Sequence, residues 1–237
     1  MCKTTASPKE IRIEVYPDWA PIGSDRFLEL VRDNYFTKSP FFRVVKGFLV
    51  QFGIPADPSK WKEWHDKGPI NDDPPKGVSF KRGYLSFAGY GEDSRTTELF
   101  VAYSDENGFG NTRWEVPFGV VQDMDVFDQI NDEYGDVPPY GQGPDQQQLY
   151  LRGNAYLTEN FPKMDYISYC SIESEQNSFN TEISILNELP SYESKGKSES
   201  YIFFRGEVWL LFIGIGYLGF LFVYKMNGTT TQEYKIL

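Results

Sequence analysis

The sequence predicts an all-β barrel or sandwich with helical plugs, followed by one membrane-spanning helix near the C-terminus. Three observations support this class. Short apolar segments are separated by loops that are rich in the 21 Gly and 15 Pro of the 237-residue chain. Only two segments of the domain have helical periodicity. One long run of uncharged apolar residues lies close to the C-terminus.

Each predicted element follows from its local pattern. Ile11, Ile13 and Val15 alternate with charged residues, as in a half-buried strand over residues 11–15. Ser24 is expected to cap a helix whose apolar positions share one face. Further strands are predicted at residues 41–45, 48–52, 84–88, 99–103 and 118–121, and a second short helix is predicted at residues 124–130.

The composition divides the chain into four parts. Residues 7–170 have the pattern of one globular domain. Residues 171–205 are expected to form an acidic, Ser-rich linker, because positions 171–200 hold eight Ser and six Glu. Residues 206–226 are the predicted transmembrane helix, and residues 227–237 are a short tail.

The apolar run at residues 208–224 contains 17 residues without a charge. As a helix it spans about 25 Å, near the lower limit for crossing a membrane. The alternative is a buried helix of a soluble fold, but that helix would have a polar face, and this run has none. Residues 1–10 contain no apolar run, so we expect no secretory signal peptide. The sequence therefore predicts a single-pass membrane protein anchored near its C-terminus. It does not indicate which membrane this is, or on which side of that membrane the domain lies.

Charge and residue counts exclude several functions. The chain has 23 basic and 34 acidic residues and a net charge of −11, so we expect no nucleic-acid partner. His65 is the only histidine, and Cys2 and Cys170 are the only cysteines. Zinc sites of four cysteines, or of two cysteines and two histidines, are therefore excluded, and we expect no metal or cofactor.

The two cysteines are enough for one disulfide. We nevertheless expect neither cysteine to be structural, because Cys2 lies near the N-terminus and Cys170 at the end of the domain.

The segment FFRVVKGFLVQFG, residues 41–53, places an arginine among aromatic residues in a predicted β-hairpin. Arg43 is unusual there, because arginine is mostly exposed unless it is paired. One alternative is an arginine stacked on a phenylalanine at the surface. The segment resembles the signature of cyclophilin-type peptidyl-prolyl isomerases, and the resemblance continues in order through residues 83–88, 98–101, 117–121 and 124–130. Residues 153–157 and 161–167 resemble the end of a bacterial-type subgroup.

The resemblance implies a cyclophilin-like eight-stranded antiparallel barrel with two capping helices. It also implies that Arg43 is the catalytic hydrogen-bond donor. The residues that it implies for substrate binding are Phe48, Leu49, Phe100 and Phe109 around the proline ring, Gln51 and Glu98 along the peptide backbone, and Ala88 and Gly89 beside the groove. For the phenylalanines at 48 and 100 the alternative is ordinary core packing. The chain departs from the family at Phe42, Gly89 and Glu98, where many members carry histidine, asparagine and glutamine.

The function that this resemblance implies is peptidyl-prolyl cis–trans isomerisation, or rotamase activity, which assists protein folding at a membrane. Rotation about an X–Pro bond faces a barrier of about 18–20 kcal/mol and breaks no bond, so it needs neither a nucleophile nor a metal. Proline-containing peptides or proteins are the expected substrates, and the chain is expected to be a monomer. One alternative is a catalytically weak module that binds proline-containing segments of a membrane partner. Another is a membrane adaptor in which the linker and the span matter most.

Overall fold

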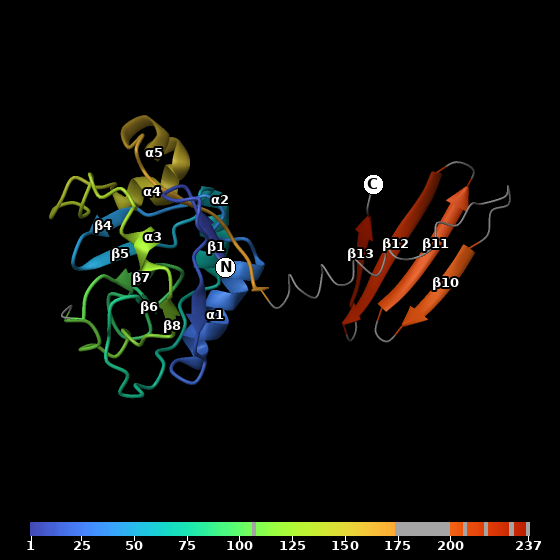
Figure 1. The fold of residues 1–237 in the computed structure, drawn as a ribbon, viewed down its shortest axis with the longest axis horizontal. Helices are drawn as coiled ribbons and strands as arrows, with labels where there is room; N and C mark the ends of the chain where they lie inside the picture. Colours follow the sequence, from blue (N-terminus) through green and yellow to red (C-terminus); the bar gives the residue numbers. More distant parts are fainter. Residues whose placement is uncertain (106–107, 174–199, 206–207, 216–217, 228–229, 236–237) are drawn as a thin grey trace. The chain divides into compact units, whose positions relative to one another are not determined.

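The computed structural model describes residues 1–105, 108–173, 200–205, 208–215, 218–227 and 230–235 (Figure 1). The chain divides into two compact units, residues 1–181 and residues 182–237. Residues 174–199, most of the predicted linker, lie outside the described residues. The first unit contains the candidate site.

Six antiparallel strands form the main sheet of the first unit, in the order β2-β8-β6-β7-β5-β4. Each strand lies within a segment predicted from the sequence, so the alternating and apolar patterns are confirmed. Their bounds are β2 (Ile13–Val15), β4 (Arg43–Val45), β5 (Leu49–Phe52), β6 (Tyr84–Phe87), β7 (Leu99–Ala102) and β8 (Gly119–Val121).

A second sheet has three strands in the order β1-β9-β3, with bounds β1 (Cys2–Thr4), β3 (Ser39–Pro40) and β9 (Tyr166–Cys170). The expected closed eight-stranded barrel is therefore wrong for the described residues, because the main sheet ends at the edge strands β2 and β4. A loop explains the open edge at β4. The Val44 N–H there donates to the carbonyl of Gly135 at 3.1 Å, so a loop occupies a backbone group that a further strand would need.

Five helices complete the described part of the first unit, with bounds α1 (Pro21–Arg32), α2 (Pro58–Asp66), α3 (Met124–Phe127), α4 (Gln146–Arg152) and α5 (Asn154–Asn160). The predicted cap at Ser24 is wrong. Helix α1 begins three residues earlier at Pro21, and Ser24 is buried inside it. The carboxylate of Asp73, from a distant loop, accepts the N–H groups of Ile22 and Gly23 instead. The predicted second helix is present as α3, but it ends at Phe127.

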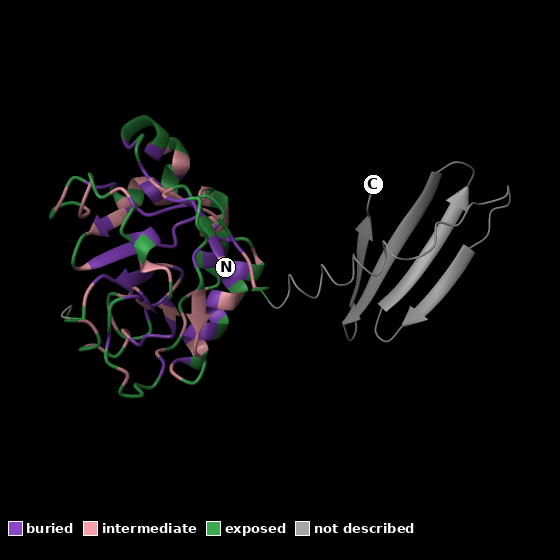
Figure 2. Cartoon of the chain, viewed as in Figure 1, coloured by how far each residue is buried: buried purple, intermediate pink, exposed green. Residues whose placement is uncertain are grey.

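The main core lies between the sheet and α1, and Figure 2 shows the buried residues concentrated along the strands and one side of this helix. Aromatic rings fill much of it. Phe27 of α1 packs on Phe118 beside β8, with ring centroids 5.4 Å apart, and Phe118 packs on Phe87 of β6 at 5.3 Å. All three side chains are at most 4% exposed. The aromatic-rich composition therefore supplies the core that holds the sheet in place.

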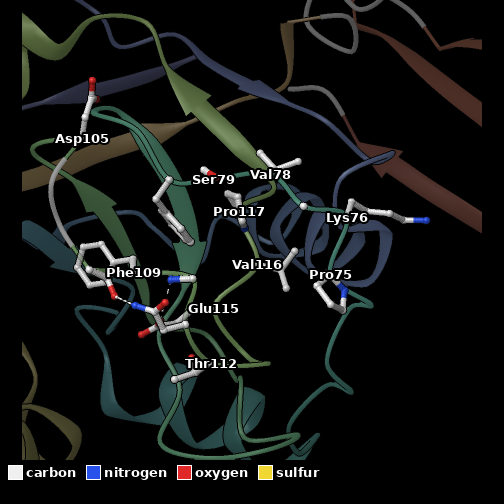
Figure 3. A pocket seen from close by; sticks show the side chains of 15 residues that line it. Pro75, Lys76, Val78, Ser79, Asp105, Phe109, Thr112, Glu115, Val116 and Pro117 are labelled. Atoms are coloured by element: carbon white, nitrogen blue, oxygen red, sulfur yellow. Dashed lines mark hydrogen bonds between the residues drawn. The ribbon is translucent and has the colours of Figure 1, made fainter.

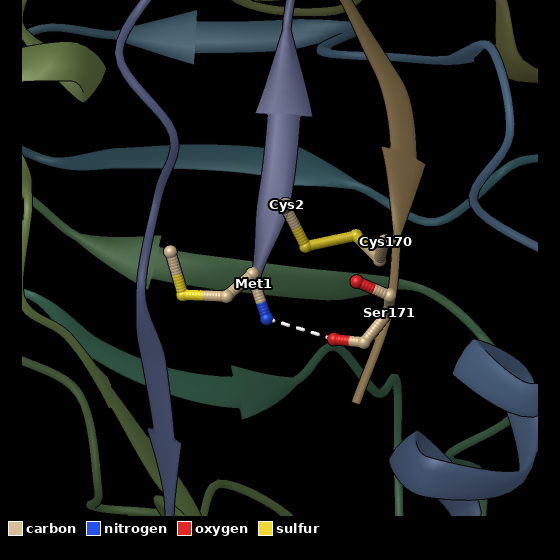
Figure 4. The surroundings of a disulfide bond; sticks show 4 residues. All are labelled: Met1, Cys2, Cys170 and Ser171. Atoms are coloured by element: carbon tan, nitrogen blue, oxygen red, sulfur yellow. Dashed lines mark hydrogen bonds between the residues drawn. A yellow bond between two sulfur atoms is a disulfide. The ribbon is translucent and has the colours of Figure 1, made fainter. Parts of the chain in front are cut away.

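A disulfide joins Cys2 to Cys170, so the expectation that neither cysteine is structural is wrong (Figure 4). The antiparallel pairing of β1 with β9 places the two residues directly opposite each other. The amino group of Met1 also donates to the carbonyl of Ser171 at 2.8 Å. The two ends of the domain, far apart in the sequence, are thus adjacent strands of one sheet, a pairing that no local pattern indicates.

The second unit contains four antiparallel strands in the order β10-β11-β12-β13. Their bounds are β10 (Ser200–Arg205), β11 (Val208–Ile215), β12 (Leu218–Asn227) and β13 (Thr230–Lys235). The helix predicted over residues 206–226 is therefore wrong, and none of the helices in the described part of the chain has the length and apolar character to cross a membrane. Composition gives the physical reason. Ten of the 17 residues at 208–224 are β-branched or aromatic and three are glycine, which favours strands over a helix.

Candidate active site

The register of the main sheet brings the predicted site residues together. Arg43 on β4 lies opposite Gln51 on β5, and Gln51 lies opposite Phe100 on β7. Residues that are directly opposed across antiparallel strands point to the same face of the sheet. A polar pair and an aromatic ring therefore lie in one row across three strands. Because strand residues alternate in direction, Val44, Val50 and Val101 point the other way, into the main core.

An apolar cluster lies on the same face as this row. Its buried members are Leu49, Phe80, Phe100 and Ala102, and Phe48, Tyr84, Ala88 and Phe109 pack against them. The ring of Phe109 stacks on Phe48, with centroids 4.8 Å apart, and contacts Phe100 at 4.5 Å. All the residues predicted to surround a proline ring are therefore neighbours. Phe80, whose ring stacks on Phe100 at 5.7 Å, was not predicted, because it lies in a loop without periodicity.

Arg43 is three-quarters buried and held on two sides. Its Nε and Nη2 groups donate to Asp136 at 2.6 and 3.2 Å, and its Nη1 group donates to the side-chain oxygen of Gln51 at 3.2 Å. The guanidinium carbon lies 5.9 Å from the ring centre of Phe48. The arginine therefore stands at the edge of the apolar cluster, as the sequence-based assignment requires.

Glu98 extends this hydrogen-bond network away from Arg43. Its carboxyl group accepts from the side-chain amides of Gln51 and Gln146, both at 3.0 Å, and from the hydroxyl of Tyr150. Burial raises the pKa of Glu98 above its ordinary value, and the three donors oppose that rise. Burial likewise raises the pKa of Tyr150. Because Gln51 donates to Glu98 through its nitrogen, its oxygen is turned toward Arg43. The role predicted for Glu98 in binding a substrate backbone stays a prediction.

Gly89 lies beside the cluster, immediately after Ala88, and is closely covered. A Cβ atom at this position would lie 2.8 Å from Cδ1 of Trp114 and 3.0 Å from the Ser94 hydroxyl. Trp114 therefore occupies the place that a side chain at position 89 would need. The indole was not assigned to the groove from the sequence, because nothing local indicates which strand or loop it faces.

A cavity of about 340 Å³ lies next to the apolar cluster, between residues 75–80 and the loop that ends at Pro117 (Figure 3). Phe80 and Phe109 belong both to its lining and to the apolar cluster. Its polar lining includes Asp105 and Glu115, and Glu115 accepts the N–H of Gly110 at 3.0 Å. Among the residues that the structure describes, no group of three or more His, Cys, Asp or Glu side chains could hold a metal ion.

Comparison with known proteins gives a consistent result. The family model described as cyclophilin type peptidyl-prolyl cis-trans isomerase/CLD matches residues 1–148. A peptidyl-prolyl cis-trans isomerase-like 3 of Dictyostelium discoideum is 29% identical over 120 residues, which are 50% of this chain and 74% of that protein. A peptidyl-prolyl cis-trans isomerase of Acinetobacter baylyi is 30% identical over 125 residues, 51% of this chain and 65% of that protein.

Among solved structures, a cyclophilin type peptidyl-prolyl cis-trans isomerase of Cryptosporidium parvum matches with a TM-score of 0.46 and 21% identity. That match covers 59% of this chain and 89% of the other. The matched segment of the family model includes the row on β4, β5 and β7, the apolar cluster and the loop that carries Asp136.

Proposed function

The chain belongs to the cyclophilin-type peptidyl-prolyl cis-trans isomerase family, and from this premise we propose that Arg43 and the apolar cluster bind and isomerise X–Pro bonds of peptides. The single observation that supports this site is the position of Arg43, which lies beside Phe48 and is hydrogen-bonded to Gln51. A cationic donor thus adjoins an aromatic surface that can hold a proline ring. We also propose that the chain belongs to the bacterial-type subgroup, because residues 153–157 and 161–167 resemble the end of its members.

The reaction needs a twisted amide to be stabilised. In that state the amide nitrogen loses its resonance with the carbonyl and carries a lone pair, so a hydrogen-bond donor aimed at it lowers the barrier. A donor that is held in place beforehand is worth more than a mobile one, because no reorganisation is needed during the reaction. The apolar cluster contributes by holding the proline ring away from water.

Arg43 retains donors for this task. A guanidinium has five N–H groups. Asp136 accepts two of them and Gln51 accepts one, so two have no partner among the residues that the structure describes, one on Nη1 and one on Nη2. The aromatic ring of Phe48 lies near the same group. The site can therefore present N–H groups from both terminal nitrogens to a peptide that places its proline ring on the phenylalanines.

The experiment that tests the function is exchange NMR on an Ala-Pro peptide with the full chain. We expect Arg43→Ala to lower kcat/KM about 10²–10³-fold, the usual effect of losing a preorganised donor. Arg43→Lys should recover little, because an ammonium lacks the planar fork of a guanidinium. Arg152→Ala, which removes an arginine paired with Glu159 on the surface, is the matched control and should keep the wild-type rate. Wild-type exchange rates in a folded Arg43→Ala variant would contradict the proposal.

A second candidate function is a module that binds proline-containing segments without useful turnover. The position of Glu98 favours it, because many family members are expected to carry glutamine there and the Glu98 carboxyl accepts the side-chain amide of Gln51 at 3.0 Å. This amide is then less available to orient a substrate backbone for turnover. The same NMR samples separate the two functions, since a binding module would show peptide line broadening at the wild-type protein without acceleration of cis–trans exchange.

Membrane attachment through residues 206–226 is a separate proposal, supported by the 17 uncharged residues at 208–224. Assistance of protein folding at that membrane and the monomeric state likewise stay predictions. Alkaline carbonate extraction tests the attachment. The full chain is expected in the pellet, and a chain that ends at Ser200 is expected in the supernatant. Release of the full chain would contradict the attachment.

A further inference from the structure

We propose that Asp136 is a positioning residue that fixes the guanidinium of Arg43 for catalysis. This inference rests on the proposed function and adds a residue that the sequence did not indicate. Asp136 lies in the loop between α3 and α4, 93 positions after Arg43. It contacts no reacting atom in this proposal and acts only through the arginine.

The contact between the two side chains is a two-point clamp. Oδ1 of Asp136 accepts from Nε of Arg43 at 2.6 Å, and Oδ2 accepts from Nη2 at 3.2 Å. Two parallel hydrogen bonds fix both the position and the plane of a guanidinium, which a single bond cannot do. Both side chains are 22% exposed, so water competes less for these bonds than it does at a surface pair.

Asp136 is itself fixed in position by hydrogen bonds from the backbone of its own loop. The N–H of Val137 donates to its Oδ1 at 2.7 Å, and the N–H of Gly143 donates to its backbone carbonyl at 2.8 Å. The loop is in turn joined to β4, because the Val44 N–H donates to Gly135 at 3.1 Å. The carboxylate is therefore fixed to the strand that carries Arg43.

Two glycines allow the loop to close this tightly. A Cβ atom at position 141 would lie 2.2 Å from the backbone oxygen of Asp136, and one at position 143 would lie 2.8 Å from the same atom. Neither distance is possible for a residue with a side chain unless the backbone moves. The segment Gly141-Gln142-Gly143 is thus the local sequence feature that lets the loop fold around Asp136.

Within the described part of the chain, the clamp leaves two N–H groups of the guanidinium for a substrate. Asp136 takes the edge formed by Nε and Nη2, and Gln51 takes one N–H of Nη1, so the two remaining N–H groups belong to different terminal nitrogens. An arginine side chain that must be ordered during the reaction loses rotamer entropy at that moment. Ordering it in the free protein moves this cost from the transition state to folding. The opposite role, a carboxylate that occupies Arg43 and competes with substrate, is the alternative that the test must separate.

The test compares Asp136→Asn with a matched control in the full chain. We expect Asp136→Asn to lower kcat about tenfold with little change in KM, because the donor is still present but no longer held. Asp136→Glu keeps the carboxylate and should recover part of the loss. Asp128→Asn is the control, since Asp128 pairs with another arginine, Arg82, outside the site, with Nη2 of Arg82 2.7 and 2.8 Å from its two carboxylate oxygens. It should keep the wild-type rate.

A double-mutant cycle shows whether Asp136 acts through Arg43. Asp136→Asn should have no further effect on kcat in the Arg43→Ala background, and circular dichroism must show each variant folded. If Asp136→Asn raises kcat, Asp136 obstructs Arg43, and if kcat is unchanged, Asp136 has only a structural role. Either result would overturn this inference and leave the proposed function intact. An inactive wild-type chain would instead overturn the proposed function, and this inference with it.

Discussion

Asp73 and Arg95 form an ion pair whose two side chains have no exposed surface, with Nη1 of Arg95 3.0 Å from Oδ2 of Asp73. The same carboxylate accepts the N–H groups of Ile22 and Gly23 at the start of α1. Arg95 also donates to the carbonyl of Asn71. One buried carboxylate thus links the first helix to two loops that are distant in the sequence.

Removal of this carboxylate should be strongly destabilising. Asp73→Ala leaves Arg95 as a buried cation with one partner fewer and leaves two helix N–H groups without their acceptor. We expect the free energy of unfolding to fall by about 3–5 kcal/mol. Chemical denaturation followed by circular dichroism measures this loss. Asp128→Asn is the control, because the exposed pair with Arg82 should contribute only about 0–1 kcal/mol. Equal losses in the two variants would contradict the prediction.

The disulfide between Cys2 and Cys170 should contribute measurably to stability, because it closes nearly the whole domain into a loop. The sequence separation is 168 residues, and crosslinks over long loops restrict the unfolded chain most. We expect the double variant Cys2→Ser, Cys170→Ser to lose about 2–5 kcal/mol of unfolding free energy. A thiol reductant should lower the stability of the wild type to the same level and leave the variant unchanged. A transition that neither change affects would refute this prediction.

The main sheet could be predicted from the sequence because its strands have local signals. Alternation over residues 11–15 and the apolar runs elsewhere place β2 and the central strands. Strand β9 has no comparable signal, because it is defined by pairing with β1 more than 160 residues away. Helix α2 does have a local signal in the sequence, since Asp57 caps it and Pro58 occupies its first turn, a pattern typical of helix starts. In the C-terminal run, length and absence of charge indicate a helix, whereas its β-branched and aromatic residues favour the strands that the structure shows.

The residues of the candidate site also divide into those that the sequence indicates and those that it does not. Arg43, Gln51 and Phe100 could be identified because their strands carry family motifs and the register then aligns them. Asp136 and Phe80 could not, because both reach the site from loops whose course depends on tertiary contacts. The position of Trp114 over Gly89 is of this second kind too. Sequence reasoning therefore found the residues of the sheet and missed those that hold them in place.

The half-buried Glu98, whose carboxyl group has a raised pKa, should make stability depend on pH. Its raised pKa means that the folded protein binds this proton more tightly than the unfolded chain does. As pH rises above the ordinary carboxyl value, the unfolded state loses the proton first, so this group's contribution to stability decreases until the pH passes the raised pKa.

Glu98→Gln should remove that dependence. Relative to the wild type, the variant should gain unfolding free energy as pH rises above the ordinary carboxyl pKa of about 4, and the difference should become constant once the pH passes the raised pKa of Glu98. Thermal unfolding of both proteins across this range measures it. Glu159→Gln, which changes an exposed glutamate on α5, is the control and should follow the wild type throughout. A difference that is independent of pH would show that Glu98 is ionised to the same extent in both states.

Gly89 stands where many relatives are expected to carry asparagine, and the structure leaves little room for that side chain. Gly89→Asn would place Cβ 2.8 Å from Cδ1 of Trp114. The Ser94 hydroxyl, on the other side, is held by the N–H groups of Tyr90 and Gly91 at 2.9 and 3.1 Å, so it gives way less easily than the indole. The tryptophan must therefore move, and we expect a loss of about 1–3 kcal/mol in unfolding free energy, as for other overpacked sites.

A double-mutant cycle identifies the indole as the cause. In a Trp114→Ala background the obstruction is gone, so Gly89→Asn should cost less than about half as much as in the wild type, which is a coupling of the size seen between contacting side chains. Denaturant unfolding of the four proteins measures this coupling. The same cost in both backgrounds would mean that Ser94 or the backbone, and not Trp114, excludes a side chain at position 89. The glycine would then be required by the loop itself, and the departure from asparagine would say nothing about the indole beside the groove.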